Sequence, residues 1–196
     1  YAPEELETLH HVEQALRAIQ LWVKHVNQQG GIYLNERAQS LPLRLIVYDD
    51  RSKTERAKGN VLRLLKEDQV DLLFGTYSSV LTMAVASIAE NQKKILWNHG
   101  GASDAIFKPG WRYLVSVLSP ASSYLCSLPS YLTMRVPALR RISCLRASSG
   151  TFATYVAEGL IEAAKPHGLS VRQTSFNSPL KNTSRVLKRA LTHHPD

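Results

Sequence analysis

Apolar and polar positions alternate along this chain with two periods, one typical of amphipathic helices and one of short buried strands. Between residues 4 and 28, apolar side chains recur every three or four positions and form one stripe, which predicts a long helix. Gly30 and Gly31 follow directly and predict its end. The pattern also predicts helices at 53–68, 79–91, 151–165 and 180–191, a helical turn at 103–107, a helix over 119–134 interrupted or bent near Pro129, and strands at 43–48, 70–74, 94–97, 113–117, 141–145 and 170–175.

This regular alternation predicts an α/β fold with a doubly wound parallel sheet, covered by helices on both faces. We expect a first α/β lobe at 1–118, a crossover or hinge region at 119–140, where three prolines fall, and the start of a second α/β lobe at 141–196. The chain opens on a helix and closes where another strand is expected. We therefore expect the first lobe to lack its first strand and the second lobe to be truncated.

Composition places the chain in an ordinary class. Its 196 residues are 44% hydrophobic and 20% charged, as in soluble globular proteins. The sequence has neither an apolar run of the roughly 20 residues needed to span a bilayer nor the pattern of a signal peptide at its start. The two cysteines, Cys126 and Cys144, fit no metal motif. Buried free thiols are favoured, and a single disulfide is the alternative.

The net charge of +8 is unevenly distributed. Residues 1–134 hold 14 Lys and Arg against 13 Asp and Glu, whereas residues 135–196 hold 10 against 3. A nucleic-acid surface is one interpretation of the basic part. That part has no helix-turn-helix, zinc or RNA-recognition motif, so a solvated basic face is favoured and no nucleic-acid partner is expected.

Two polar turns follow neighbouring predicted strands, at 76–79 and 99–103. In the second turn, the N–H groups of Gly100 and Gly101 and the hydroxyl of Ser103 could hold a small anion. Because parallel strands end at one edge of a sheet, the two turns predict a cleft for a small carboxylate. Simpler roles stay open, since the serines of the first turn could cap the following helix, the glycines could form only a tight turn, and Asp104 is expected to cap the turn after it.

Other chemistry has little support. Asp49 and Asp50 at a strand end suggest Mg²⁺, but the next strand ends in Phe-Gly-Thr and supplies no further carboxylate. We expect no metal and no cofactor. The chain lacks a Gly-x-Ser-x-Gly elbow, a phosphate-binding loop and a dinucleotide glycine motif. A triad of Ser79, His99 and Asp104 has nothing in the sequence to orient it, so we do not expect an enzyme.

The segments 21–32, 43–50, 70–79 and 95–104, and less closely 142–158, together carry a family pattern. In their order and spacing the chain resembles the type I periplasmic substrate-binding proteins, in the branch that binds leucine, isoleucine, valine and related amino acids or amides. The resemblance implies two lobes that close on a ligand and deliver it to an ABC importer. It also implies a ligand-binding set: Tyr77, Ser78, Ser79, Gly100, Gly101, Ala102, Ser103 and Phe152.

Within that set, the resemblance implies that the hydroxyls of Ser79 and Ser103 bind the ligand carboxylate. It also implies that the carbonyl of Gly101 binds the ligand ammonium and that Phe152 forms an aromatic wall in the second lobe. Tyr77, Ser78, Gly100 and Ala102 would line the pocket, where small side chains let a ligand approach the backbone.

The resemblance also implies partners and a location. We expect a small amino acid or related carboxylate as ligand, ABC transporter membrane subunits as partners, and a periplasmic or extracellular location. Because the family's first strand has no counterpart here, a homodimer or strand exchange could supply it. A ligand-sensing domain of a membrane receptor and the effector-binding core of a transcription regulator are the alternative functions.

Overall fold

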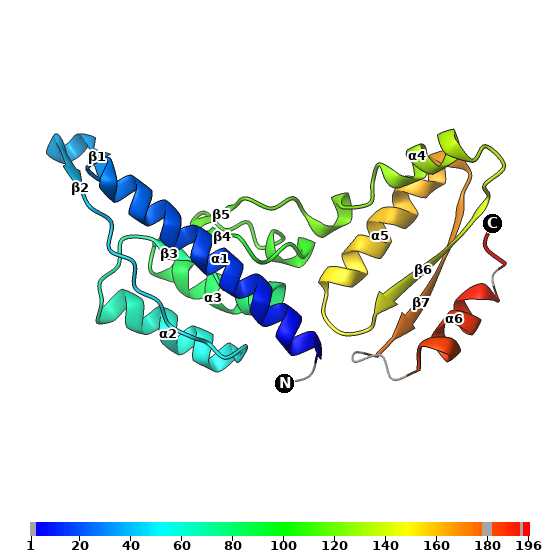
Figure 1. Cartoon of the computed structure of the whole chain (residues 1–196), viewed down its shortest axis with the longest axis horizontal. Helices are drawn as coiled ribbons and strands as arrows, with labels where there is room; N and C mark the ends of the chain where they lie inside the picture. The colour runs from blue at the N-terminus through cyan, green and yellow to red at the C-terminus, as the bar shows by residue number, and fades with distance from the viewer. Residues whose placement is uncertain (1–2, 178–181, 193) are drawn as a thin grey trace. The chain divides into compact units, whose positions relative to one another are not determined.

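The computed structural model describes residues 3–177, 182–192 and 194–196 (Figure 1). Side chains are described from Val12 onward. The chain forms two compact units, residues 1–49 and residues 50–196. The predicted lobe boundaries at 118 and 141 follow a different criterion and stay predictions.

The first unit consists of a long helix and a hairpin. Helix α1 (Pro3–Gln28) ends where the two glycines predict it, and both glycines have positive φ. The N–H of Gly31 donates to the carbonyl of Val26 at 2.9 Å, which closes the last turn in a left-handed conformation that glycine adopts without strain. Strands β1 (Ile32–Leu34) and β2 (Gln39–Leu41) then pair antiparallel around the 3₁₀ turn η1 (Asn35–Arg37).

The predicted strand at 43–48 is wrong, because the structure assigns no strand to these residues. The side-chain amide of Asn27 instead accepts from the N–H of Leu43 at 2.7 Å and donates to its carbonyl at 2.9 Å. An apolar run becomes a strand only if a neighbouring backbone supplies ladder hydrogen bonds. The hairpin before it was not predicted, because its strands are short and its left-handed residue is Ala38, which is not a turn-forming type.

The second unit begins with a parallel three-stranded sheet in the order β3 (Leu73–Phe74), β4 (Leu96–Asn98), β5 (Leu114–Ser116). Helices α2 (Thr54–Lys66) and α3 (Ser79–Asn91) pack on each other and on this sheet. Their shared core is apolar and almost fully buried, and it comprises Ala57, Val61, Leu73, Leu81, Val85, Ala86, Ala89 and Leu96. This core fixes the two turns that follow β3 and β4.

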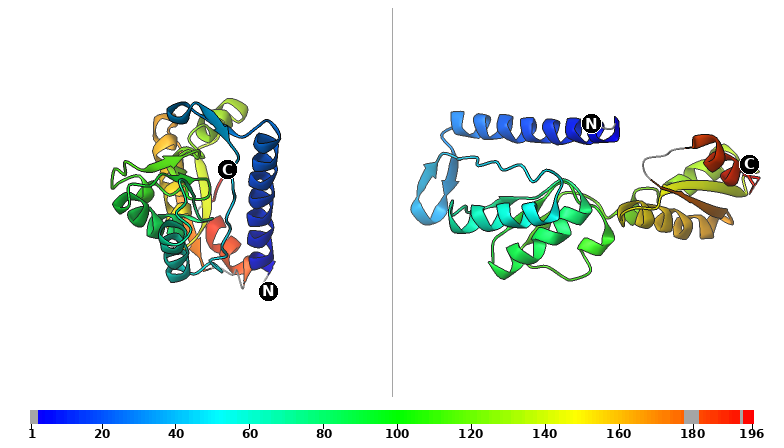
Figure 2. Two further views of the ribbon diagram at one scale, coloured as in Figure 1. Left: turned by 90° about the vertical axis from the view of Figure 1, so that its left-hand side faces the viewer. Right: turned by 90° about the horizontal axis from the view of Figure 1, so that it is seen from below.

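A second parallel sheet pairs β6 (Arg141–Ala147) with β7 (Ser170–Phe176). Helix α5 (Phe152–Ala164) contacts one face of this sheet and α6 (Thr183–Leu191) the other (Figures 1 and 2). Helices on both faces of parallel strands confirm the predicted α/β, doubly wound class. The predicted start of the last helix at residues 180–181 lies outside the described residues.

The predicted helix over 119–134 is interrupted, as expected. It consists of the 3₁₀ turn η3 (Ala121–Ser123) and helix α4 (Leu128–Arg135), which begins with Pro129 in its first turn. The predicted turn near 103–107 is the 3₁₀ turn η2 (Asp104–Ile106), and α5 continues into a further 3₁₀ turn, η4 (Lys165–His167). Most of the remaining predicted elements match the observed ones to within a few residues.

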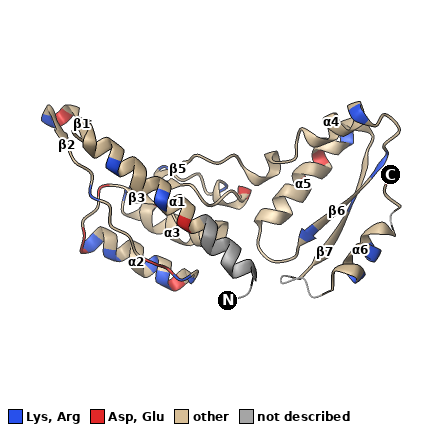
Figure 3. Cartoon of the chain, viewed as in Figure 1, with Lys and Arg blue, Asp and Glu red and all other residues tan. Residues whose placement is uncertain are grey.

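Figure 3 shows where Lys and Arg lie along the ribbon of the C-terminal part. Several of these basic residues bond to neighbouring groups of the fold. Arg140 donates to two backbone carbonyls, Arg141 pairs with Asp196 at 2.9 Å, and Arg146 donates to Gln173 at 2.7 Å. The Arg141 side chain, followed by the backbone N–H of Arg140, lowers the pKa of Asp196. None of the described helices is both long enough and apolar enough to cross a membrane.

Both cysteines are free thiols. Cys144 in β6 is half-buried, and burial raises the pKa of its thiol. Cys126 is exposed, so the expectation of a buried thiol is wrong for this residue, which lies in the irregular link between η3 and α4.

Candidate functional site

A cavity of about 460 Å³ lies where β3 and β4 end and where α5 begins. This volume is within the range of pockets that hold small organic molecules, which is about 300–1,000 Å³. Its lining comes from five separate stretches of the chain and comprises Tyr77, Ser78, Ser79, Val80, His99, Gly100, Ala102, Leu118, Tyr124, Gly150, Thr151 and Phe152. Six of the eight predicted ligand-binding residues belong to this lining. Gly101 and Ser103 do not.

Ser78 holds the first turn in a strained conformation. Its hydroxyl accepts from the N–H of Leu81 at 3.3 Å, so it caps α3 as the simpler interpretation expected. Its backbone, however, has φ 132° and ψ 152°, a region that residues other than glycine rarely adopt. Strain of this kind is held in place by the surrounding structure and concentrates at binding sites.

Ser79 joins the two turns. Its hydroxyl oxygen accepts from the N–H of Ser103 at 3.0 Å, across 24 positions of sequence. Because a hydroxyl has one donor and two acceptor positions, its hydrogen stays available to a group in the cavity.

The second turn is organised by Asn98, which is fully buried at the end of β4. Its side-chain oxygen accepts from the N–H of Gly101 at 2.8 Å and of Gly100 at 3.3 Å, and its amide donates to the Gly101 carbonyl at 2.6 Å. The amide also donates to the hydroxyl of Ser116 at 3.1 Å. The expected anion nest at the two glycines is therefore wrong, because both N–H groups are already bonded. Sequence reasoning missed Asn98, although an asparagine between an apolar strand and two glycines was the available signal.

The glycines are required by close packing of the two turns. A Cβ on Gly100 would lie 2.7 Å from the Cα of Tyr77 and 2.8 Å from the carbonyl oxygen of Thr76. A Cβ on Gly101 would lie 2.7 Å from the hydroxyl of Thr82. A side chain at Gly100 would push the two turns apart, whereas one at Gly101 would press against Thr82 of α3 and Ile106 of η2.

Ser103 and Asp104 link the second turn to later segments. Ser103 is almost fully buried, and its hydroxyl shares a 2.7 Å hydrogen bond with the hydroxyl of Thr151, next to α5. The carboxylate of Asp104 accepts from both the N–H and the hydroxyl of Ser122 in η3. Asp104 was expected to cap the turn that it begins, but its carboxylate instead binds the turn η3. It therefore does not orient His99.

Aromatic rings form much of the cavity wall. Phe152 meets Tyr124 edge to face, with ring centroids 5.4 Å apart and an interplanar angle of 79°. His99 also lines the cavity, and its ring is tilted by 59° relative to that of Phe74, with centroids 6.5 Å apart. Its Nδ1 is buried with no hydrogen-bond partner among the described residues, and burial lowers the pKa of the ring. Tyr124, Thr151 and Leu118 were not predicted, because only the folded chain brings them to this place.

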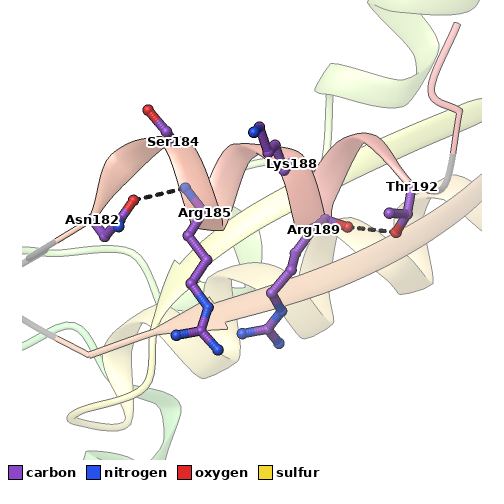
Figure 4. Close-up of a pocket in the computed structure, with 6 residues that line it drawn as sticks. All are labelled: Asn182, Ser184, Arg185, Lys188, Arg189 and Thr192. Carbon is purple, nitrogen blue, oxygen red and sulfur yellow. Dashed lines mark hydrogen bonds between the residues drawn. The ribbon is translucent and has the colours of Figure 1, made fainter.

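A second hollow of about 440 Å³ runs along α6 (Figure 4). Asn182, Ser184, Arg185, Lys188, Arg189 and Thr192 line it, and all of them lie on this helix or at its ends. In Figure 4 the side chains of Arg185 and Arg189 extend side by side from the helix. Every one of these residues is exposed, so the hollow is an open helix face rather than an enclosed site.

The described residues contain no group of three or more His, Cys, Asp or Glu that could hold a metal ion. Asp50, considered above for Mg²⁺, accepts from the N–H of Ser52 at 2.8 Å and forms a turn.

Comparison with known proteins gives one family and many similar folds. Residues 12–196 match the model of a family described as "Periplasmic binding protein". Among solved structures, an ABC transporter substrate-binding protein from Desulfitobacterium hafniense in complex with Leu has a TM-score of 0.73 at 18% identity, covering 90% of this chain and 50% of that one. The branched-chain amino acid transporter substrate-binding protein LivJ from Streptococcus pneumoniae, in complex with isoleucine, has 0.72 at 19%, covering 87% and 46%.

A solute-binding protein of an ABC transporter from Rhodopseudomonas palustris BisB5, in complex with 3,4-dihydroxybenzoic acid, has a TM-score of 0.77 at 15% identity. The match covers 96% of this chain and 49% of that protein. The chain thus spans about half the length of the structures that it matches.

Proposed function

Because the chain belongs to the periplasmic binding protein family, we propose that it captures a small amino acid, or a related carboxylate or amide, for an ABC importer. The family consists of solute-binding proteins and is not an enzyme class. The observation that carries the proposal is the cavity of about 460 Å³, in which six predicted ligand-binding residues gather from separate turns. We assign its chemistry to binding alone.

The polar wall of the cavity suits a carboxylate. An enclosed charge needs hydrogen-bond donors that are already in place. The hydroxyl of Ser79 is held by the N–H of Ser103 and keeps its hydrogen for the ligand. The role of Gly101 toward the ligand ammonium stays a prediction, because this residue does not line the cavity and its carbonyl accepts from Asn98.

The aromatic wall suits the rest of the ligand. Tyr77, Tyr124 and Phe152 each remain more than a third exposed in this structure, so apolar surface is available to a bound side chain. Leucine, isoleucine and 3,4-dihydroxybenzoate, which are bound by similar structures, each combine a carboxylate with an apolar body. These three compounds form the core of the ligand panel below.

Isothermal titration calorimetry of the full encoded protein tests the proposal, using the three compounds, further amino acids and simple amides. We expect at least one carboxylate of the panel to bind. Ser79→Ala should weaken it about 10- to 100-fold, because a hydrogen bond to a charged group contributes about 1.5–3 kcal/mol.

The control is Ser87→Ala on the same helix, where the exposed hydroxyl bonds the Ala84 carbonyl and does not line the cavity. This variant should bind like the wild type. No heat with any ligand would contradict the proposal, as would equal affinities for Ser79→Ala and the wild type.

Two further parts of the proposal concern location and assembly. Membership of this family implies a location outside the cytoplasm, and we propose the periplasm or the extracellular side, which fractionation of cells would test. The homodimer or strand exchange stays a prediction. Light scattering of the purified protein measures its molar mass and so tests the homodimer.

A further inference from the structure

His99 lies in the wall of the cavity in an unusual state for a histidine. Its Nδ1 is shielded from solvent and has no hydrogen-bond partner among the described residues. The residue lines the cavity next to Gly100, and its ring packs against Phe74. Among the residues that the structure describes, His99 forms no ion pair with a carboxylate, and the carboxylate of Asp104 bonds Ser122. The ring is therefore held by packing.

The shielded Nδ1 determines which tautomer the ring adopts. A neutral imidazole carries its proton on one nitrogen and a lone pair on the other. A buried N–H without an acceptor is rarer in proteins than an under-used acceptor, so the proton belongs on Nε2. Protonating both nitrogens would place a second N–H at the shielded position, and this agrees with the lowered pKa of the ring.

We propose that His99 determines ligand specificity by donating a hydrogen bond from Nε2–H to a carboxylate oxygen of the bound ligand. This inference rests on the proposed function and names the donor that selects the acidic end of the ligand. A rigid ring fixed by packing offers its N–H at one position and loses little freedom on binding.

Three other donors of the second turn are already bonded within the protein, which supports the assignment. The N–H groups of Gly100 and Gly101 donate to Asn98. The hydroxyl of Ser103 is buried and shares its hydrogen bond with Thr151. His99 and Ser79 then form a two-donor clamp from neighbouring turns, and two donors match the two oxygens of a carboxylate.

Calorimetry with leucine, isoleucine and 3,4-dihydroxybenzoate tests the inference on three variants of the full protein. His99→Phe keeps a flat ring without a donor, His99→Gln places an amide N–H near the position of Nε2, and His99→Asn places one near Nδ1. We expect His99→Phe and His99→Asn to weaken the best ligand about ten-fold or more. We expect His99→Gln to restore much of that affinity, which a purely structural role would not do.

The outcomes separate the two proposals. If wild type binds none of the three compounds and none of the wider panel, the proposed function fails and this inference fails with it. If wild type binds and His99→Phe binds equally well, only this inference is overturned. Long-range ¹⁵N–¹H NMR of the histidine rings gives a readout without ligand, since a proton found on Nδ1 of His99 would also overturn it.

Discussion

Replacing a glycine by alanine should have opposite effects on stability at two positions in helix interiors, Gly159 and Gly59. Gly159 lies in the middle of α5, and a Cβ there would fall 1.8 Å from the carbonyl oxygen of Ser122 and 2.7 Å from its Cα. Gly59 lies in the middle of α2, where a Cβ would meet nothing within 4 Å. Alanine favours a helix over glycine by about 0.5–1 kcal/mol at both places. Only the steric environment of the two positions differs.

At Gly159 the steric term exceeds the gain in helix propensity. The obstructing atoms belong to the backbone of η3, so α5 and η3 must separate instead of a side chain rotating away. Overpacking of this kind costs about 1–3 kcal/mol and more where backbone must shift. We expect Gly159→Ala to be less stable by about 1–3 kcal/mol, and each kcal/mol lowers Tm by about 2–4 °C in a protein of this length.

Thermal unfolding followed by circular dichroism measures both variants beside the wild type. Gly59→Ala is the matched control, and it should raise Tm by a few degrees for the same propensity reason. A Gly159→Ala protein that melts at or above wild type would refute the close approach of α5 and η3. A Gly59→Ala protein that melts lower would refute the assumption that propensity decides at an open helix position.

Three further changes test the site. Asn98→Leu keeps the volume but removes the partners of the Gly101 backbone, so unfolding free energy in urea should fall by about 1–3 kcal/mol for each group left unpaired; an unchanged midpoint would contradict this role. Ser78→Gly should stabilise the folded protein, because it relieves backbone strain of about 1–3 kcal/mol and loses only a few tenths of a kcal/mol from the helix cap. Ser78→Ala loses the cap and keeps the strain, so it should have the lower Tm of the two variants. The opposite order of Tm would contradict the strained conformation. Burial holds the pKa of His99 below its ordinary 6.5, so below that pH the unfolded state binds a proton that the folded state does not. The contribution of His99 to stability should be full above pH 6.5 and decrease below it. In urea titrations at several pH values, the unfolding free energy of His99→Phe should therefore decrease less steeply than that of the wild type.

Sequence periodicity was sufficient to predict the elements that are stabilised mainly by residues within the element itself. Helix α3 matches its predicted range of 79–91, because an apolar stripe and a capping serine both lie within the segment itself. The segment 43–48 failed for the opposite reason, since strand formation depends on a neighbour that no local pattern encodes. The hairpin of β1 and β2 depends on a left-handed Ala38, which composition does not indicate.

The candidate site likewise has a part that could be predicted from the sequence and a part that could not. The two turns could be predicted, because their residues follow strands directly and parallel strands end at one edge. The hydrogen bond between Ser103 and Thr151 spans 48 positions, and no pattern within either turn contains it. Asn98 shows the limit most clearly: the residue was visible in the sequence, but its capture of both glycine N–H groups is a property of the folded turn.

The unequal environments of the two thiols make this protein suited to site-selective labelling. Maleimides react with the thiolate, so the exposed Cys126 should react well before Cys144, whose half-buried thiol has a raised pKa. Cys126 follows Tyr124, a wall residue of the cavity, by two positions. An environment-sensitive fluorophore attached there would report occupancy of the cavity from the native sequence, with no cysteine introduced or removed.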